Sequence, residues 1–157
     1  MNDIFYKIID KIKESVSNSK FNNKVTFGDI TEVDLGKLTN FPLAHVIVES
    51  AEISERTVSY NVRLLVCDVV DVNKDYVDDN DFYGNSNTQD ILNTQFHVIN
   101  KLVRDLMKND LRDNGFTAVS EGGTISATPF RDRFENELAG WETEMTVMVF
   151  NDIGCDD

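Results

Sequence analysis

The sequence predicts an α+β fold in which a mainly antiparallel sheet has two helices packed on one face. Apolar residues recur every three or four positions in residues 4–16 and 88–109, a spacing typical of amphipathic helices. Apolar and polar residues alternate in residues 57–70 and 140–150, a pattern typical of half-buried strands. The length of 157 residues fits one domain, residues 1–157, with a core of its own.

The first helix is expected to begin after Asn2 or Asp3, either of which can serve as its N-cap. Its apolar positions follow the 3.6-residue period and are Ile4, Phe5, Ile8, Ile9, Ile12 and Val16. A short strand is predicted at residues 25–27. Residues 28–41 are expected to be irregular, because glycine and proline punctuate them.

Two long central strands are predicted at residues 43–49 and 57–70, joined by the polar segment 50–56. A second helix is expected over residues 88–109, and Asn114-Gly115 stops it. The side chains that this helix is expected to bury are Ile91, Leu92, Phe96, Ile99, Leu102, Val103 and Leu106.

The last third of the chain is predicted to form strands. Residues 116–120 and 124–128 are expected to pair as a hairpin about Glu121-Gly122-Gly123. In the final strand, 140–150, one face carries Trp141, Thr143, Met145, Val147 and Val149, and the other carries Glu142, Glu144, Thr146, Met148 and Phe150.

The segment before the final strand is too aromatic for a solvated loop and too charged for a core. Such a mixture is typical of a surface that lies against a partner. The candidate subunit interface consists of Phe130, Arg131, Arg133, Phe134, Leu138 and Trp141. We expect its aromatic rings to serve assembly more than folding.

The net charge of −13, with an isoelectric point near 4.4, argues against direct binding to nucleic acid or anionic lipid. The charge is uneven. Residues 1–24 hold five lysines against three acids, net +2, which leaves −15 for the remainder. A homo-oligomer could therefore set the basic end of one copy against the acidic body of the next. No apolar run approaches membrane-spanning length, and we expect a soluble protein.

Residues 71–87 form an acidic loop that begins like an EF-hand calcium site. The match fails because Tyr76 stands where the turn needs glycine and Phe82 where a bidentate glutamate belongs. A solvated charged loop is the preferred interpretation, and no metal site is predicted. Its candidate acidic residues are Asp71, Asp75, Asp78, Asp79 and Asp81. A second acidic segment is the tail at residues 151–157.

No catalytic motif is found in the sequence. His45 falls in a predicted strand and His97 in a predicted helix, and neither has a signature that joins it to a nucleophile. Cys67 and Cys155 lack the spacing of a zinc site and favour a reducing compartment. Glu135 and Glu137 are interpreted as part of a solvated face. The sequence predicts neither an enzyme nor a cofactor.

The last third of the chain contains the sequence PFRDRFENELAGWETEMTVMV, which is followed by an acidic tail that contains cysteine. This sequence and the order of elements resemble the tail-terminator and neck-ring family of tailed bacteriophages. The chain looks most like ring proteins of crAss-like phages. The resemblance implies an N-terminal helix, a long projecting β-hairpin, a helix that covers the sheet, and closing strands. The part of the sequence that is specific to this family covers residues 128–149.

The resemblance further implies a virion structural protein in the neck or tail, assembled in the host bacterial cytoplasm. Copies of the chain would form a ring of twelve or six between portal, connector or tail proteins. DNA would pass through its acidic lumen without specific binding. The alternative is an acidic decoy that mimics DNA to occupy a host nuclease or repressor.

Overall fold

We describe the protein from a computed structural model. The structure describes residues 4–71, 86–107, 116–118, 124–133 and 136–151. Its elements are α1 (Ile4–Ser17), β1 (Lys24–Phe27), the 3₁₀ turns η1 (Ile30–Glu32) and η2 (Leu38–Asn40), β2 (Leu43–Ile53), β3 (Thr57–Val69), α3 (Thr88–Met107), β4 (Phe116–Ala118), β5 (Ala127–Arg133) and β6 (Glu137–Phe150).

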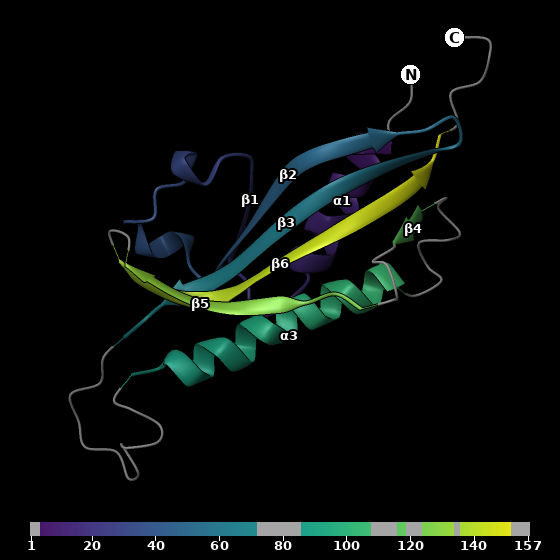
Figure 1. Ribbon diagram of the computed structural model, residues 1–157. Coiled ribbons are helices and arrows are strands. Elements are labelled where there is room, and N and C mark those ends of the chain that lie inside the picture. The colour runs from purple at the N-terminus through teal and green to yellow at the C-terminus, as the bar shows by residue number, and fades with distance from the viewer. Residues whose placement is uncertain (1–3, 72–85, 108–115, 119–123, 134–135, 152–157) are drawn as a thin grey trace.

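The fold is α+β, as the sequence predicts. The strands form one six-stranded sheet in the order β1-β2-β3-β6-β4, and β5 also pairs with β6 (Figure 1). All pairings are antiparallel except that of β1 with β2. The two longest strands, β3 and β6, lie side by side at the centre and pair from Thr57 with Phe150 to Val69 with Leu138.

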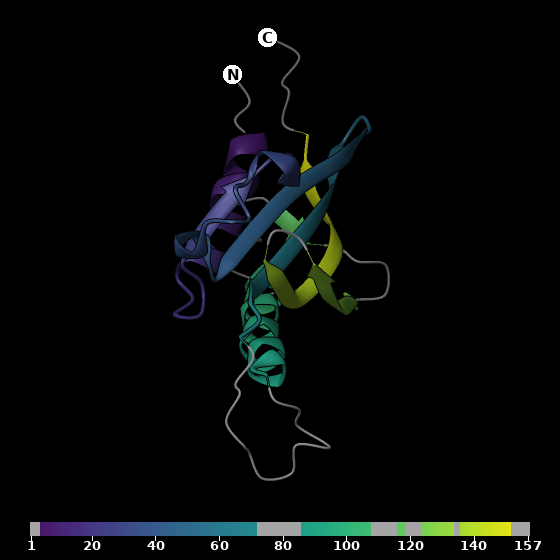
Figure 2. The same cartoon turned by 90° about the vertical axis from the view of Figure 1, so that its left-hand side faces the viewer.

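Helices α1 and α3 both cover one face of this sheet, as the end view shows (Figure 2). The main core lies between the helices and the sheet. It takes alternate residues of the strands, because successive side chains of a strand point to opposite faces. Its fully buried members include Ile12 and Val16 of α1, Leu64 of β3 and Leu102 of α3.

A smaller core lies on the opposite face of the sheet, at one end. Buried Phe41, Leu43, Cys67 and Leu138 form it, and Phe130 packs against it half-buried. The predicted irregular segment, residues 28–41, covers this end with two 3₁₀ turns. Among the residues that the structure describes, no helix lies on the rest of this face (Figure 1). We call this uncovered part the open face.

The predicted strand pair at residues 43–70 is confirmed, but β2 is longer than expected. It continues through Ser50 to Ile53, so the turn is only residues 54–56. Ser54 closes the turn by donating its backbone N–H to the carbonyl oxygen of Thr57, 2.8 Å away. Because β6 follows β3 up to Thr57, the hairpin is paired within the sheet. Its role as a projecting arm stays a prediction.

The predicted hairpin between residues 116–120 and 124–128 is wrong. β4 and β5 both pair with β6, at different places along the same edge. Phe116 lies opposite Val149, whereas Ala127 lies opposite Thr143. β5 instead forms a hairpin with the start of β6, where Arg133 pairs with Glu137. β6 offers both strands a long edge of backbone hydrogen-bonding groups. The glycines of a local turn do not reveal that this edge is the preferred partner.

The second helix is confirmed over Thr88–Met107, and its predicted end at residue 109 lies outside the described residues. Its buried face differs from the prediction. Gln95 and Val98 are buried, whereas Phe96 is 46% exposed. α3 packs against β6 and β3, and the angle at which it docks sets which of its side chains are buried. The prediction that Phe96 is buried rested on its hydrophobicity alone.

Candidate functional site

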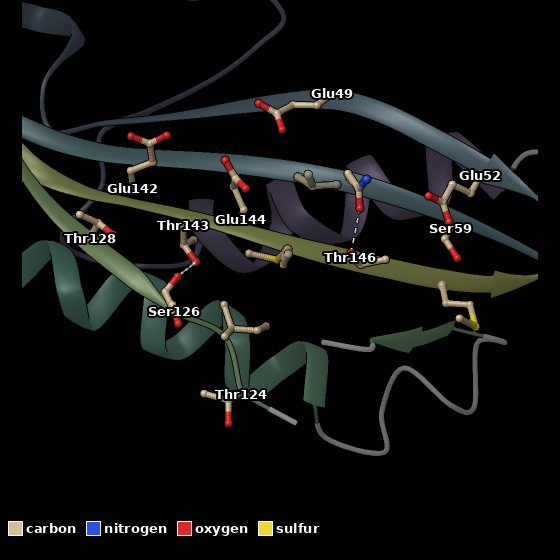
Figure 3. A pocket seen from close by; sticks show the side chains of 15 residues that line it. Glu49, Glu52, Ser59, Thr124, Ser126, Thr128, Glu142, Thr143, Glu144 and Thr146 are labelled. Carbon is tan, nitrogen blue, oxygen red and sulfur yellow. Dashed lines mark hydrogen bonds between the residues drawn. The ribbon is translucent and has the colours of Figure 1, made fainter. Parts of the chain in front are cut away.

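The open face of the sheet holds a groove of about 1020 Å³. Residues of β2, β3 and β6 and of the segment 124–128 line it. Four of the lining residues are glutamates, Glu49, Glu52, Glu142 and Glu144 (Figure 3). We call this feature the acidic groove.

The strands position these carboxylates by simple alternation. Glu142 and Glu144 are two residues apart on β6, so both point to the open face while Thr143 and Met145 point to the core. On β2 the pairing register shifts between Val48 and Ser50. Glu49 reaches the same face by alternation from Leu43, and the bulge brings Ser50 and Glu52 to that face as well.

Arg63 of β3 pairs with three of the four glutamates. Its Nε donates to Glu142 and lies 3.9 Å from Oε1 of Glu144, while its Nη1 donates to Oε1 of Glu49 at 3.3 Å. The hydrogen bond to Glu142 and the neighbouring carboxylates raise the pKa of Arg63 above its ordinary value. Four carboxylates against one guanidinium leave a net charge of −3 here.

A chain of hydrogen bonds crosses the floor of the groove. The Thr146 hydroxyl donates to Oδ1 of Asn61 at 2.8 Å, and Nδ2 of Asn61 donates to Oγ of Ser50 at 2.8 Å. At the rim, the Thr143 hydroxyl donates to the carbonyl oxygen of Ser126, which ties the segment before β5 to β6 (Figure 3). These bonds hold β2, β3 and β6 in fixed relation beneath the carboxylates.

The structure divides the candidate subunit interface. Phe130 packs against the smaller core, and Arg131 is exposed with its Nε 2.6 Å from Oε1 of Glu137. Leu138 is 1% exposed and is therefore a core residue, which corrects its assignment to an interface. The side chain of Arg133 and all of Phe134 lie outside the described residues.

Trp141 is half-buried and joins β6 to α3. Its Nε1 donates to the carbonyl oxygen of Leu92 at 2.7 Å, and its ring lies 5.2 Å from that of Phe96, measured between centroids. A role for Trp141, Phe130 and Arg131 in subunit contact stays a prediction.

Of the candidate acidic loop, only Asp71 is described. It is exposed, and its backbone N–H donates to Oδ1 of Asn87 at 2.7 Å. Asp75, Asp78, Asp79 and Asp81 lie outside the described residues, as does the acidic tail after residue 151. Within the part of the chain that the structure describes, no group of three histidine, cysteine or acidic side chains could hold a metal ion.

The histidines and the described cysteine have structural surroundings. His45 is fully buried, with Nδ1 2.7 Å from Oγ1 of Thr26 and Nε2 2.9 Å from the carbonyl oxygen of Gly28. His97 is exposed, and its ring lies edge-on to Phe21. Burial raises the pKa of the Cys67 thiol to about 12, so this thiol stays protonated and unreactive near neutral pH.

The acidic groove was missed at the sequence level. Its signal was present, because the predicted alternation already placed Glu142 and Glu144 on one face of the final strand. What the sequence does not show is that β2 lies two strands away in the sheet and that a bulge turns Glu52 to the same face as Glu49.

No protein-family model matches the chain, and no curated protein is significantly similar to it. None of the helices among the described residues is long and apolar enough to cross a membrane.

Proposed function

We propose that the chain is a virion structural protein that forms a homo-oligomeric ring in the neck or tail of a tailed bacteriophage. The resemblance of residues 128–149 to ring proteins of this family supports the proposal. The α+β fold, with an N-terminal helix and a second helix on a mainly antiparallel sheet, agrees with the outline that this resemblance implies.

The observation that carries the proposal is the unlike chemistry of the two sides of the sheet. One side is covered by α1 and α3, and the segment from residue 5 to residue 20 carries four lysines against two acids. The other side is open and holds the acidic groove. Unlike surfaces on opposite sides favour head-to-tail contacts between copies, and such contacts close into a ring when the rotation between neighbours permits.

The overall charge suits a ring through which DNA passes. A chain of net charge −13 repels the phosphate backbone, so a duplex would not adhere to the wall of the ring during ejection. In this proposal the ring has twelve or six copies, and its partners are the portal, connector or tail proteins above and below it. Assembly takes place in the cytoplasm of the host bacterium.

Native mass spectrometry and negative-stain electron microscopy of the purified protein test the proposal. We expect closed particles of six or twelve copies with a central opening, formed in increasing amount as protein concentration rises. The same sample in high salt is the control, because screening weakens contacts between charged surfaces. A monomer at all concentrations, or a two-fold dimer that grows no further, would contradict the ring.

The alternative is an acidic decoy that mimics DNA. The exposed carboxylates of the acidic groove favour it, but Arg63 bonds to two of them and lies close to a third, which reduces the phosphate-like charge. A decoy would displace duplex DNA from a nuclease or repressor while remaining a monomer. Competition of the purified protein against labelled duplex on such a host protein separates the two functions.

A further inference from the structure

We propose that the acidic groove of one copy receives the exposed surface of helix α1 from a second copy of the chain. This inference rests on the proposed ring and names the contact that would build it. Two surfaces would form the contact. One is the outward surface of α1, with unpaired lysines and exposed aromatic rings, and the other is the acidic groove, with more carboxylates than cations.

The cationic side is the outward surface of α1. Lys7 and Lys13 are both exposed, and neither has a partner among the residues that the structure describes. Lys11, by contrast, is paired with Glu14 at 3.4 Å. Asp10, also exposed, lies three residues from each of them, so α1, with three lysines and two acidic residues, keeps a net charge of +1 in a chain that is otherwise strongly acidic.

Aromatic side chains lie beside these lysines. Tyr6 is 67% exposed, and its ring lies 6.1 Å from Phe5 between centroids. Phe5 in turn contacts Tyr60 of β3 and Phe27 of β1, and Phe27 is 50% exposed. Exposed aromatic residues that are supported from behind by packed rings are typical anchors of protein interfaces.

The anionic side is the acidic groove. Arg63 offsets only part of its charge: Glu144 remains 3.9 Å away from the guanidinium and largely exposed, and Glu52 has no partner among the described residues. Met148 also lines the groove and is half-buried, so it offers an adaptable apolar surface to an aromatic ring. Free lysines and an exposed ring on one surface thus face free carboxylates and a thioether on the other.

The dimensions of the two surfaces agree. Helix α1 has 14 residues and is therefore about 21 Å long. Along β6 the groove extends from Glu142 to Met148, six steps that span about 20 Å. An amphipathic helix laid along a groove is also a common mode of recognition between proteins.

The topology requires two copies for this contact. α1 packs on the face of the sheet that carries the main core, and the acidic groove lies on the opposite face. One subunit therefore cannot bring its own α1 to its own groove. The contact is heterologous, because the surface used by one copy differs from the surface used by the next, and repetition of it gives a ring or a filament.

A second set of cations, on α3, is less suited to the groove. A small cavity of about 250 Å³ there includes His97, Lys101 and Arg104, but Asp105 also lines it. Lys101 donates to the carbonyl oxygen of Ser15 at 3.0 Å and lies 3.6 Å from Asp105. Its charge is therefore already used within the subunit.

A charge exchange between two variants tests the contact. The helix variant carries Lys7→Glu and Lys13→Glu, and the groove variant carries Glu52→Lys and Glu144→Lys. Sedimentation velocity at low salt should show that wild-type protein associates, and that each variant alone associates more than about tenfold more weakly, because like charges now face each other. An equal mixture should regain association, because each helix then meets a groove of opposite charge.

Control variants change the net charge equally at other exposed positions. Lys37→Glu with Arg104→Glu matches the helix variant, and Glu32→Lys with Asp71→Lys matches the groove variant. These should associate as wild type does, and circular dichroism should show that all four variants are folded. A monomeric wild type, failure of the mixture to associate, or equal weakening by the controls would overturn the inference.

The outcomes for the contact and for the ring are distinguishable. A closed ring that is insensitive to the charge exchange would overturn this contact and direct attention to the edge of β2 beyond Val46, which β1 leaves unpaired, while the ring itself would stand. Chains or open filaments that obey the charge exchange would support the contact and overturn the ring.

Discussion

At the scale of single residues, Gly140 lies where β6 passes the backbone of β3. A Cβ atom at this position would be 1.9 Å from the carbonyl oxygen of Val66 and 2.7 Å from the Cα of Cys67. Both are backbone atoms in a paired central strand, so neither can move aside as a flexible side chain would. The absence of a side chain at Gly140 is therefore a requirement of the pairing.

We expect Gly140→Ala to lower the free energy of unfolding by about 3 kcal/mol or more, because the added methyl group forces β3 and β6 apart. Gly28→Ala is the matched control. Gly28 has a φ of +110°, but a Cβ there meets only a side-chain oxygen of Glu32 at 4.0 Å. The control should lose only the cost of backbone strain, about 1–3 kcal/mol. Urea denaturation measures both, and a smaller loss for Gly140→Ala would contradict the steric argument.

His45 is the residue whose burial predicts a dependence of stability on pH. Nε2 donates to the carbonyl oxygen of Gly28, which can only accept, and in the neutral ring Nδ1 then accepts from the Thr26 hydroxyl. Burial lowers the pKa of His45 below its ordinary value of 6.5, and the bond to Gly28 and the charge of Asp29 offset part of this. The folded state therefore binds this proton less readily than the unfolded state.

We expect this contribution to be fully present above pH 6.5 and to be lost progressively as the pH falls below that value, because the unfolded chain then takes up a proton that the folded chain resists. Denaturation in urea at pH 7.5 and pH 5.5 measures the effect. In His45→Gln the difference between the two pH values should shrink, whereas in His97→Gln it should stay as in wild type. An unchanged difference in His45→Gln would show that other groups cause it.

At the scale of elements, Trp141 adds a specific contact between α3 and the sheet to the apolar packing of the core. Its indole N–H reaches the carbonyl oxygen of Leu92, and its ring packs on Phe96. Phe96 is exposed on its other side. A residue that sequence reasoning assigned to an interface with another subunit therefore already joins two elements of its own subunit.

We expect Trp141→Phe to lower the free energy of unfolding by about 1–3 kcal/mol, because the carbonyl oxygen of Leu92 loses its donor in a partly buried place. Phe150→Leu, on the same strand and 58% exposed, is the control and should change stability by less than about 0.5 kcal/mol. Chemical denaturation followed by circular dichroism compares them. Equal stability of Trp141→Phe and wild type would return Trp141 to a role in assembly alone.

At the scale of the whole molecule, charge is distributed by face. Four of the five lysines near the N-terminus lie on or beside α1, and four glutamates gather in the groove on the other side of the sheet. This arrangement gives one subunit two complementary surfaces while the net charge stays at −13. Self-association and repulsion of DNA are therefore compatible in the same chain.

We expect that the protein does not retard duplex DNA in a gel, even at low salt where attraction between charges is least screened. The lysines of α1 are the groups that could oppose this expectation by attracting phosphates. The groove variant, with Glu52→Lys and Glu144→Lys, is less acidic than wild type and serves as a control for the sensitivity of the gel. Retardation by wild-type protein that weakens steeply with added salt would reveal a basic surface large enough to bind DNA.

Elements with a strong period could be predicted from sequence. The alternation in β3 and β6 and the helical spacing in α1 are each dictated by one buried face, so they appear in the sequence whatever the topology. β4 and β5 could not be placed, because their pairing partner is a strand that follows them in the chain. Gln95 was missed because a polar side chain is buried there only through its bond to the carbonyl oxygen of Phe21.

By itself the sequence determined the α+β class, the two helices, the long central strands and the strong acidity, because composition and periodicity record which residues must leave water. Tertiary structure alone decided which strands pair, that Leu138 belongs to the core, and that Glu49, Glu142 and Glu144 surround Arg63. Those relations join residues far apart in the sequence; the bond between Arg63 and Glu142, for example, spans 79 positions. Contacts over such distances depend on register, bulges and docking angles, which no local pattern specifies.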